Sequence, residues 1–157
     1  MTRKVGDMAL TKLRDHGFTQ GLTEEQLASL ASMAQEVTFQ ENELILVDGQ
    51  RSTSFYLVTR GSVAVELRTG SFAVCVQALG PGQAFGWSAL LNDQDTLFQV
   101  RAREKTTALM LKGSDLQDLC KIDTSFAAAI LQRTLQLVAG RVKATEIRFA
   151  EMCGVKL

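Results

Sequence analysis

The spacing of hydrophobic residues divides the chain into a helical beginning, a middle of short strands and a helical end. Leu27, Leu30 and Ala34 recur at helical spacing near the start. Thr23 precedes them, and Gln26 three residues later completes a capping box. A helix is therefore predicted to begin just after Thr23. A shorter helix over about residues 8–15 is predicted before it, ended by Gly17.

The middle of the chain, from Val37 to Leu111, has a different pattern. Short runs rich in Val, Phe, Leu and Thr alternate with glycine or polar turns at regular spacing. Val63 and Val65 alternate with polar or small residues, and the turn at Gly70 leads into a second run. This pattern predicts one clear hairpin within a β-sandwich or β-barrel. The last two strands are expected at about residues 99–103 and 107–112.

Helical spacing returns after Leu111. Ser114 is predicted to cap a short helix, and Thr124 or Ser125 a long one that no proline interrupts. Apolar residues of the long helix step alternately by four and three, which is the spacing of a coiled-coil seam with one polar member. The seam consists of Leu131, Leu135, Val138, Val142, Thr145, Phe149 and Met152.

A second stripe lies beside this seam on the long helix, formed by Ile130, Thr134, Leu137 and Arg141. One stripe could dock on the barrel while the other meets a second copy, and this arrangement predicts a parallel homodimer. Alternatively, both stripes cover the protein's own barrel. Gly140 weakens the coiled-coil interpretation, because glycine costs about 1 kcal/mol in a helix interior.

Composition narrows the class of protein. A chain of 157 residues fits one domain, and 46% hydrophobic with 22% charged residues is typical of a folded globular protein. Seventeen basic residues balance seventeen acidic ones, which argues against direct DNA binding. No apolar run has the length of a signal peptide or a membrane span. We therefore expect a cytoplasmic protein with three reduced cysteines.

Several short motifs together resemble the cyclic-nucleotide-binding domain of the Crp/Fnr family. They are residues 21–27, Asp48-Gly49, Phe55-Tyr56-Leu57-Val58, Gly61-Ser62-Val63, Leu79-Gly80-Pro81-Gly82 and Phe85-Gly86-Trp87-Ser88-Ala89-Leu90-Leu91. The resemblance covers nearly the whole chain. It implies a mainly β fold, a double-stranded β-helix (jelly-roll) barrel with flanking helices. The boundaries expected for one domain over residues 1–157 are a helical N-terminus at 5–35, the barrel at 37–112 and C-terminal helices at 114–154.

The segment that begins at Phe85-Gly86 corresponds to the phosphate-binding cassette of that family. Nucleotide-binding members carry a Glu after the Gly and later an Arg that pairs with the cyclic phosphate, whereas this chain has Trp87 and Thr96 at those positions. Neither replacement keeps the chemistry. Two lost interactions of this kind would weaken binding by at least about a hundredfold. Arg101 and Arg103 in the next strand offer a charge from another direction.

The resemblance therefore predicts an altered binding site rather than an ordinary cAMP site. Trp87 could stack on a flat ligand or fill the pocket. The ligand would be a cyclic nucleotide or another small anion, and no cofactor is expected. The candidate ligand-binding residues are Phe85, Gly86, Trp87, Ser88, Ala89, Leu90, Thr96, Phe98 and Gln99.

Other chemistry lacks the residues that it would need. His16 is the only histidine and the three cysteines are scattered, so no metal or iron-sulfur site is expected. There is no nucleophile-base pair, nucleophile elbow or Walker loop, and we expect no enzyme.

Two functions remain open. The leading one is a regulatory sensor module, in which a small ligand near residues 86–91 repositions the long C-terminal helix. The alternative is a ligand-free structural or protein-interaction module that works through its dimer surface. In family members that regulate transcription a DNA-binding domain follows the long helix, whereas this chain ends at Leu157. The expected partners are a second copy and a further protein, with neither DNA nor a membrane.

Overall fold

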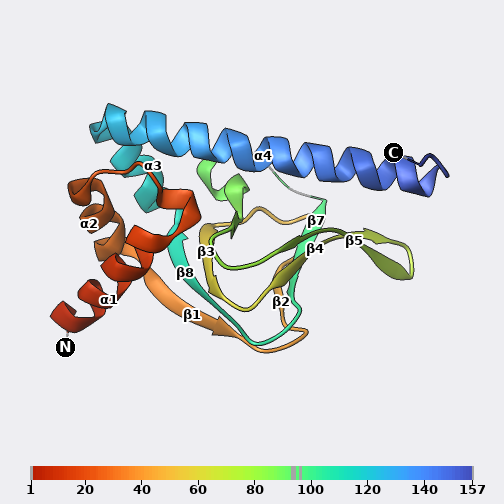
Figure 1. Cartoon of the computed structure of the whole chain (residues 1–157), viewed down its shortest axis with the longest axis horizontal. Helices are drawn as coiled ribbons and strands as arrows, with labels where there is room; N and C mark the ends of the chain where they lie inside the picture. Colours follow the sequence, from red (N-terminus) through yellow and green to blue (C-terminus); the bar gives the residue numbers. More distant parts are fainter. Residues whose placement is uncertain (1, 93–94, 96, 157) are drawn as a thin grey trace.

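The computed structural model describes residues 2–92, 95 and 97–156. Two helices and a 3-10 turn come first, eight strands and a second 3-10 turn form the middle, and two helices end the chain (Figure 1). In order, the elements are α1 (Thr2–Asp15), η1 (Gly17–Thr19), α2 (Glu24–Met33), β1 (Gln35–Phe39), β2 (Leu44–Leu46), β3 (Ser54–Arg60), β4 (Val63–Thr69), β5 (Phe72–Leu79), β6 (Ala84–Phe85), η2 (Trp87–Leu90), β7 (Phe98–Ala102), β8 (Thr106–Lys112), α3 (Gly113–Ile122) and α4 (Thr124–Met152).

The strands form two four-stranded sheets, in the orders β1-β8-β3-β6 and β2-β7-β4-β5. All pairs are antiparallel, and most join strands that are distant in sequence. The predicted hairpin is confirmed as β4 and β5, where Thr69 pairs with Phe72 across Gly70 and Ser71. The predicted jelly roll with flanking helices is therefore confirmed.

Strand β3 separates two hydrophobic cores, because its alternate side chains enter different ones. Phe55 and Leu57 pack against the helices, whereas Tyr56 and Val58 point between the two sheets. A strand buried on both faces reads as a continuous apolar run. This explains why residues 54–58 are all buried.

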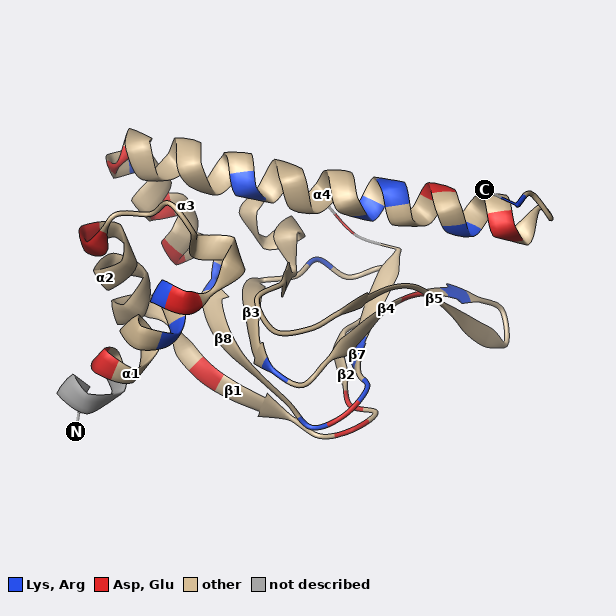
Figure 2. Cartoon of the chain, viewed as in Figure 1, with Lys and Arg blue, Asp and Glu red and all other residues tan. Residues whose placement is uncertain are grey.

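Helix α4 lies along one side of the molecule, over α3, η2 and the β4-β5 hairpin (Figure 1). Of the two stripes predicted on it, the one with Ile130, Thr134 and Arg141 is buried against the rest of the chain. Figure 2 shows that the first part of α4 carries almost no charge and that charged residues gather toward its C-terminal end.

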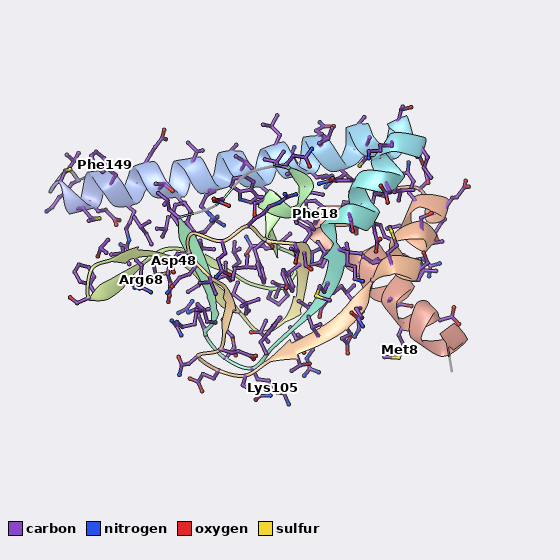
Figure 3. All side chains as sticks on the ribbon, turned by 180° about the vertical axis from the view of Figure 1, so that it is seen from behind. Met8, Phe18, Asp48, Arg68, Lys105 and Phe149 are labelled. Atoms are coloured by element: carbon purple, nitrogen blue, oxygen red, sulfur yellow. The ribbon has the colours of Figure 1, made fainter. Side chains whose placement is uncertain are left out.

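The predicted seam of α4 is largely exposed. Leu131, Leu135, Val142, Phe149 and Met152 are each at least half exposed, with Leu135 and Phe149 at 69%. Phe149 lies near the C-terminal end of α4 (Figure 3). The two stripes of the helix therefore have different environments in a single copy of the chain.

Helix ends were predicted with mixed success. The capping box of Thr23 and Gln26 is confirmed, with both of its hydrogen bonds present. The predicted cap of α3 at Ser114 is wrong, because that helix begins at Gly113 after Lys112 and has no side-chain cap. Asp123 caps α4 in place of Thr124 or Ser125, since its Oδ1 accepts from the amide of Phe126 at 2.9 Å.

The N-terminal helix is longer than predicted. α1 spans Thr2–Asp15, and one side of it is buried through Ala9 and Leu13. Met8, at the start of the predicted helix, is 59% exposed and points away from the core (Figure 3). Across the described helices, none combines the length and the apolar character needed to cross a membrane.

Candidate ligand-binding cassette

The turn at Gly86 positions the predicted cassette. β6 pairs with β3 and ends at Phe85, and Gly86 then adopts a left-handed conformation, with φ +84° and ψ 27°, before η2 begins. A Cβ at this position would lie 2.6 Å from the carbonyl oxygen of Ser54. Both the backbone angle and the lack of space therefore require glycine.

A small cavity lies beside this turn. Its lining comes from the cassette, from β2 and β7, and from one residue of α4: Leu46, Phe85, Gly86, Trp87, Ser88, Phe98, Val100 and Arg141. Its free volume is about 20 Å³, which is room for about one water molecule. In this conformation the cassette cavity is therefore closed, and a residue of α4 takes part in closing it.

Arg141 is the residue of α4 that reaches the cavity. It is 7% exposed. Its Nε donates to Oε1 of Gln77 on β5 at 2.8 Å, and its guanidinium carbon lies 5.3 Å from the centre of the Phe98 ring. Burial lowers the pKa of Arg141 to about 10, so it remains a cation at neutral pH. Its hydrogen-bond partner is neutral, and no acidic side chain in the described ranges forms an ion pair with it.

Ser88 is the second polar side chain at this cavity. It is 4% exposed and belongs to the lining, and its hydroxyl makes no hydrogen bond to the residues that the structure describes. A serine hydroxyl can donate one hydrogen bond and accept others. The cavity thus brings together a buried cation and a hydroxyl donor, from segments more than fifty residues apart in sequence.

The other predicted site residues fall into separate groups. Phe85, Trp87 and Phe98 line the cavity, together with Gly86 and Ser88. Ala89 and Leu90 turn toward the helices instead: the carbonyl of Ala89 accepts from Gln117 Nε2 at 3.1 Å, and Leu90 packs in the helical core. These two residues connect the cassette to α3 and are not brought into the cavity. Thr96 lies outside the described residues.

Gln99 and Arg101 do not reach the cavity either. Strand alternation places Phe98 and Val100 in its lining, and Gln99 and Arg101 on the opposite face of β7. Both side chains donate to Oε2 of Glu66, Gln99 at 2.6 Å and Arg101 at 3.4 Å. The idea that Arg101 replaces the missing charge is therefore wrong in this conformation, and Arg103 is exposed.

A larger cavity of about 270 Å³ lies under the preceding turns of α4. It is bordered by η1, by the β5-β6 turn and by α4, and Gln77 is part of its lining. Gln77 therefore borders this cavity while it holds Arg141 in the lining of the smaller one.

His16 holds η1 against the barrel and is not part of either cavity. Its Nδ1 accepts from the amide of Phe18 at 3.1 Å, so its Nε2 carries the proton that faces the carbonyl of Val58 at 2.9 Å. Burial lowers the pKa of His16 and favours this neutral form, while the bond to Val58 opposes the shift. Within the described part of the chain, no group of three or more His, Cys, Asp or Glu side chains could hold a metal ion.

The comparison with protein families decides the assignment. The sequence profile of the cyclic nucleotide-binding domain matches residues 36–123, more than half of the chain. The chain belongs to the cyclic nucleotide-binding domain family. The matched region contains all eight strands except the first residue of β1, and it includes the cassette and α3.

The chain spans less than a third of the length of the curated relatives that it matches. A putative potassium channel protein of Rhodopseudomonas palustris is 29% identical over 76% of the chain, which spans 28% of that relative's length. The chain spans still smaller shares of two other curated relatives, 21% and 13%.

Solved structures share the fold. A putative cyclic nucleotide-binding protein from Geobacter metallireducens has a TM-score of 0.74 and 22% identity, over 85% of this chain and 98% of that one. The regulatory subunit of a cAMP-independent protein kinase A from Trypanosoma brucei has a TM-score of 0.76 and 19% identity, over 96% of this chain and 53% of that one.

Arg141 is the site residue that the sequence did not assign to the ligand pocket. The signal was present, because Arg141 is the one charged member of the stripe that docks α4 on this cyclic nucleotide-binding domain. Charged side chains are rarely buried unless they are paired, so an arginine in a buried stripe indicates a specific contact. Arg141 and the cassette are about fifty positions apart, and the local spacing of residues cannot predict a contact over that distance.

Proposed function

We propose that this chain is a regulatory ligand-binding module of the Crp/Fnr kind with a non-standard cassette, and that it is not a catalyst. The single observation that carries the proposal is that Arg141 of α4 belongs to the lining of the closed cassette cavity. A ligand larger than a water molecule can fit only if the lining of this cavity, which includes Arg141, rearranges. Occupancy of the cavity is thereby coupled to the position of α4.

The cassette sequence supports a specificity different from that of ordinary cAMP binders. Trp87 occupies the position of the ribose-binding Glu, and Thr96 that of the phosphate-binding Arg. An indole offers one donor and no acceptor. The description of the Trypanosoma brucei subunit as cAMP-independent is compatible with such a change within this fold.

A second route also links the cassette to the helices. Ala89 of η2 accepts a hydrogen bond from Gln117 of α3, and α3 leads directly into α4 across the Asp123 cap. A change at the cassette would therefore act on α4 both at its start and at Arg141. This double contact favours a sensor whose output is the position of α4.

Thermal unfolding in the presence of cyclic mononucleotides and cyclic dinucleotides tests the proposal. A ligand at a hundred times its Kd adds about 2.7 kcal/mol to the free energy of unfolding, and one member of the panel should raise Tm accordingly. Mass spectrometry of the purified protein under native conditions should detect the same class of molecule if it is retained. The proposal fails if no nucleotide in the panel raises Tm.

A second candidate function is dimerisation through α4, with or without a ligand. The observation that favours it is the exposed seam, since Leu135 and Phe149 are each 69% exposed. Apolar residues at this spacing fit a second copy of the same helix. In this alternative the module works through its dimer surface, and a protein partner would recognise the paired helices.

Light scattering of Leu135→Glu tests the dimer. Leu135 is so exposed that the charge should not unfold the monomer, but it should dissociate a seam-mediated dimer. Gln132→Glu is the matched control, because it adds the same charge to an exposed position of α4 outside the seam. A wild-type monomer at micromolar concentration, or a variant that remains dimeric, contradicts this assembly.

A further inference from the structure

The cassette cavity contains a buried positive charge that forms no ion pair with any acidic side chain among the described residues. Arg141 is only 7% exposed, and its guanidinium has five N–H donors, of which the described residues engage the one on Nε. Removing a cation from water is costly unless an anion or several hydrogen bonds compensate. Gln77 and the Phe98 ring provide partial compensation only.

The side chains next to Arg141 could also bind an anion. Ser88 lines the cavity with a hydroxyl that none of the described residues hydrogen-bonds, and Trp87 provides an aromatic wall. The carboxylate of Glu66 is engaged by Gln99 and Arg101, outside the lining of this cavity. The cavity thus presents donors and a cation, and none of the described residues that line it is acidic.

We propose that Arg141 of α4, together with the hydroxyl of Ser88, binds the anionic group of the ligand in place of the cassette arginine that this chain lacks. The ligand class is a phosphate ester, because a guanidinium pairs with phosphate oxygens through parallel N–H donors. This inference rests on the proposed function and adds the residues that recognise the charge. On binding, a phosphate oxygen replaces Oε1 of Gln77 as the acceptor of Arg141.

The burial of Arg141 supports this assignment in energetic terms. Its pKa is lowered to about 10 by desolvation alone. An anion in the cavity would stabilise the charged guanidinium, which burial has removed from water. The resulting charge-assisted pair would also hold α4 at the cassette. A ligand would therefore tighten the contact of α4 with the barrel after an initial opening.

Trp87 makes the test specific to this cavity. It is the only tryptophan of the chain and lines the same cavity as Arg141. Its fluorescence can be titrated with cAMP, cGMP, inorganic phosphate and the uncharged nucleosides, for the wild-type protein, Arg141→Gln, Arg141→Lys and Ser88→Ala. Arg148→Gln is the control, because Arg148 lies two turns further along α4, also contacts β5 and is exposed.

We expect Arg141→Gln to weaken nucleotide binding about ten- to hundredfold, as the loss of a charge-assisted pair requires. Arg141→Lys should recover part of that loss, Ser88→Ala should cost about two- to tenfold, and Arg148→Gln should bind like the wild type. Nucleosides without phosphate should bind all the variants alike. Without ligand, Arg141→Gln should unfold at the same temperature as the wild type or higher, which a merely structural arginine would not allow.

The possible failures are distinguishable. If the wild-type protein binds a nucleotide and Arg141→Gln binds it equally well, Arg141 is not the anion-binding residue, while the proposed function stands. If nucleosides lose affinity in Arg141→Gln as much as nucleotides do, the residue shapes the cavity and does not recognise charge. If neither nucleotides nor phosphate changes the fluorescence or Tm of the wild type, both the inference and the proposed function fail.

Discussion

Gly86→Ala perturbs the cassette turn in two ways that can be separated. The φ of +84° is unfavourable for alanine, and the new Cβ would lie 2.6 Å from the carbonyl oxygen of Ser54. The left-handed conformation costs an L-residue about 1–2 kcal/mol. The steric overlap, which forces the backbone to shift, adds about 1–3 kcal/mol. The expected loss in the free energy of unfolding is therefore about 2–5 kcal/mol.

Two other glycines are matched controls for this substitution. Gly49 has a φ of +74°, and a Cβ added there would meet no atom within 4 Å, so Gly49→Ala should incur only the backbone cost of about 1–2 kcal/mol. Gly140 lies inside α4 with open space around it, and Gly140→Ala should stabilise the protein by about 0.5–1 kcal/mol.

Urea unfolding of the three variants and the wild type measures these differences. From the most to the least stable, the order should be Gly140→Ala, wild type, Gly49→Ala and Gly86→Ala. Equal losses for Gly86→Ala and Gly49→Ala would refute the reasoning, because the contact with Ser54 would then contribute nothing. The cassette turn would in that case be free to adjust, and its geometry would not constrain the ligand site.

Two further predictions concern the ends of α1 and α4. Burial lowers the pKa of His16 in the folded chain. As the pH falls, His16 of the unfolded chain therefore binds a proton first, near the usual histidine pKa of about 6.5. Stability should be constant well above this pH and fall as the pH drops below about 6.5, by up to about 1.4 kcal/mol per pH unit. His16→Gln should remove that slope in pH-dependent urea unfolding. Asp123→Ala should cost about 1 kcal/mol in the same assay, because it removes the cap of α4, whereas Thr124→Ala should change little. Equal losses for these two cap variants would show that Asp123 does not act as the cap.

The sequence predicted the elements whose signals are local. The β4-β5 hairpin follows from alternation and the turn at Gly70, and the start of α2 follows from Thr23 and Gln26. The start of α4 was misplaced by one or two residues, because Asp123, Thr124 and Ser125 are all suitable caps. Only the backbone geometry selects Asp123.

The candidate site was predicted in its cassette half and missed in its helical half. Phe85, Gly86 and Trp87 are consecutive, and family spacing identifies them. Arg141 reaches the same cavity from α4 because sheet pairing and helix docking bring the two segments together. The close approach of Gly86 to Ser54 has the same origin, since β6 pairs with β3. Contacts of this kind depend on tertiary packing, which residue patterns do not report.

The central claim is that a ligand in the cassette cavity changes the position of α4. Cys153 is exposed at the end of α4, and with Cys75 and Cys120 replaced by alanine it can carry a single acceptor dye for energy transfer from Trp87. Addition of the nucleotide that raises Tm most should change the transfer efficiency, and Arg141→Gln should need correspondingly more of it. A nucleotide that raises Tm fully and leaves the transfer efficiency unchanged would contradict the account.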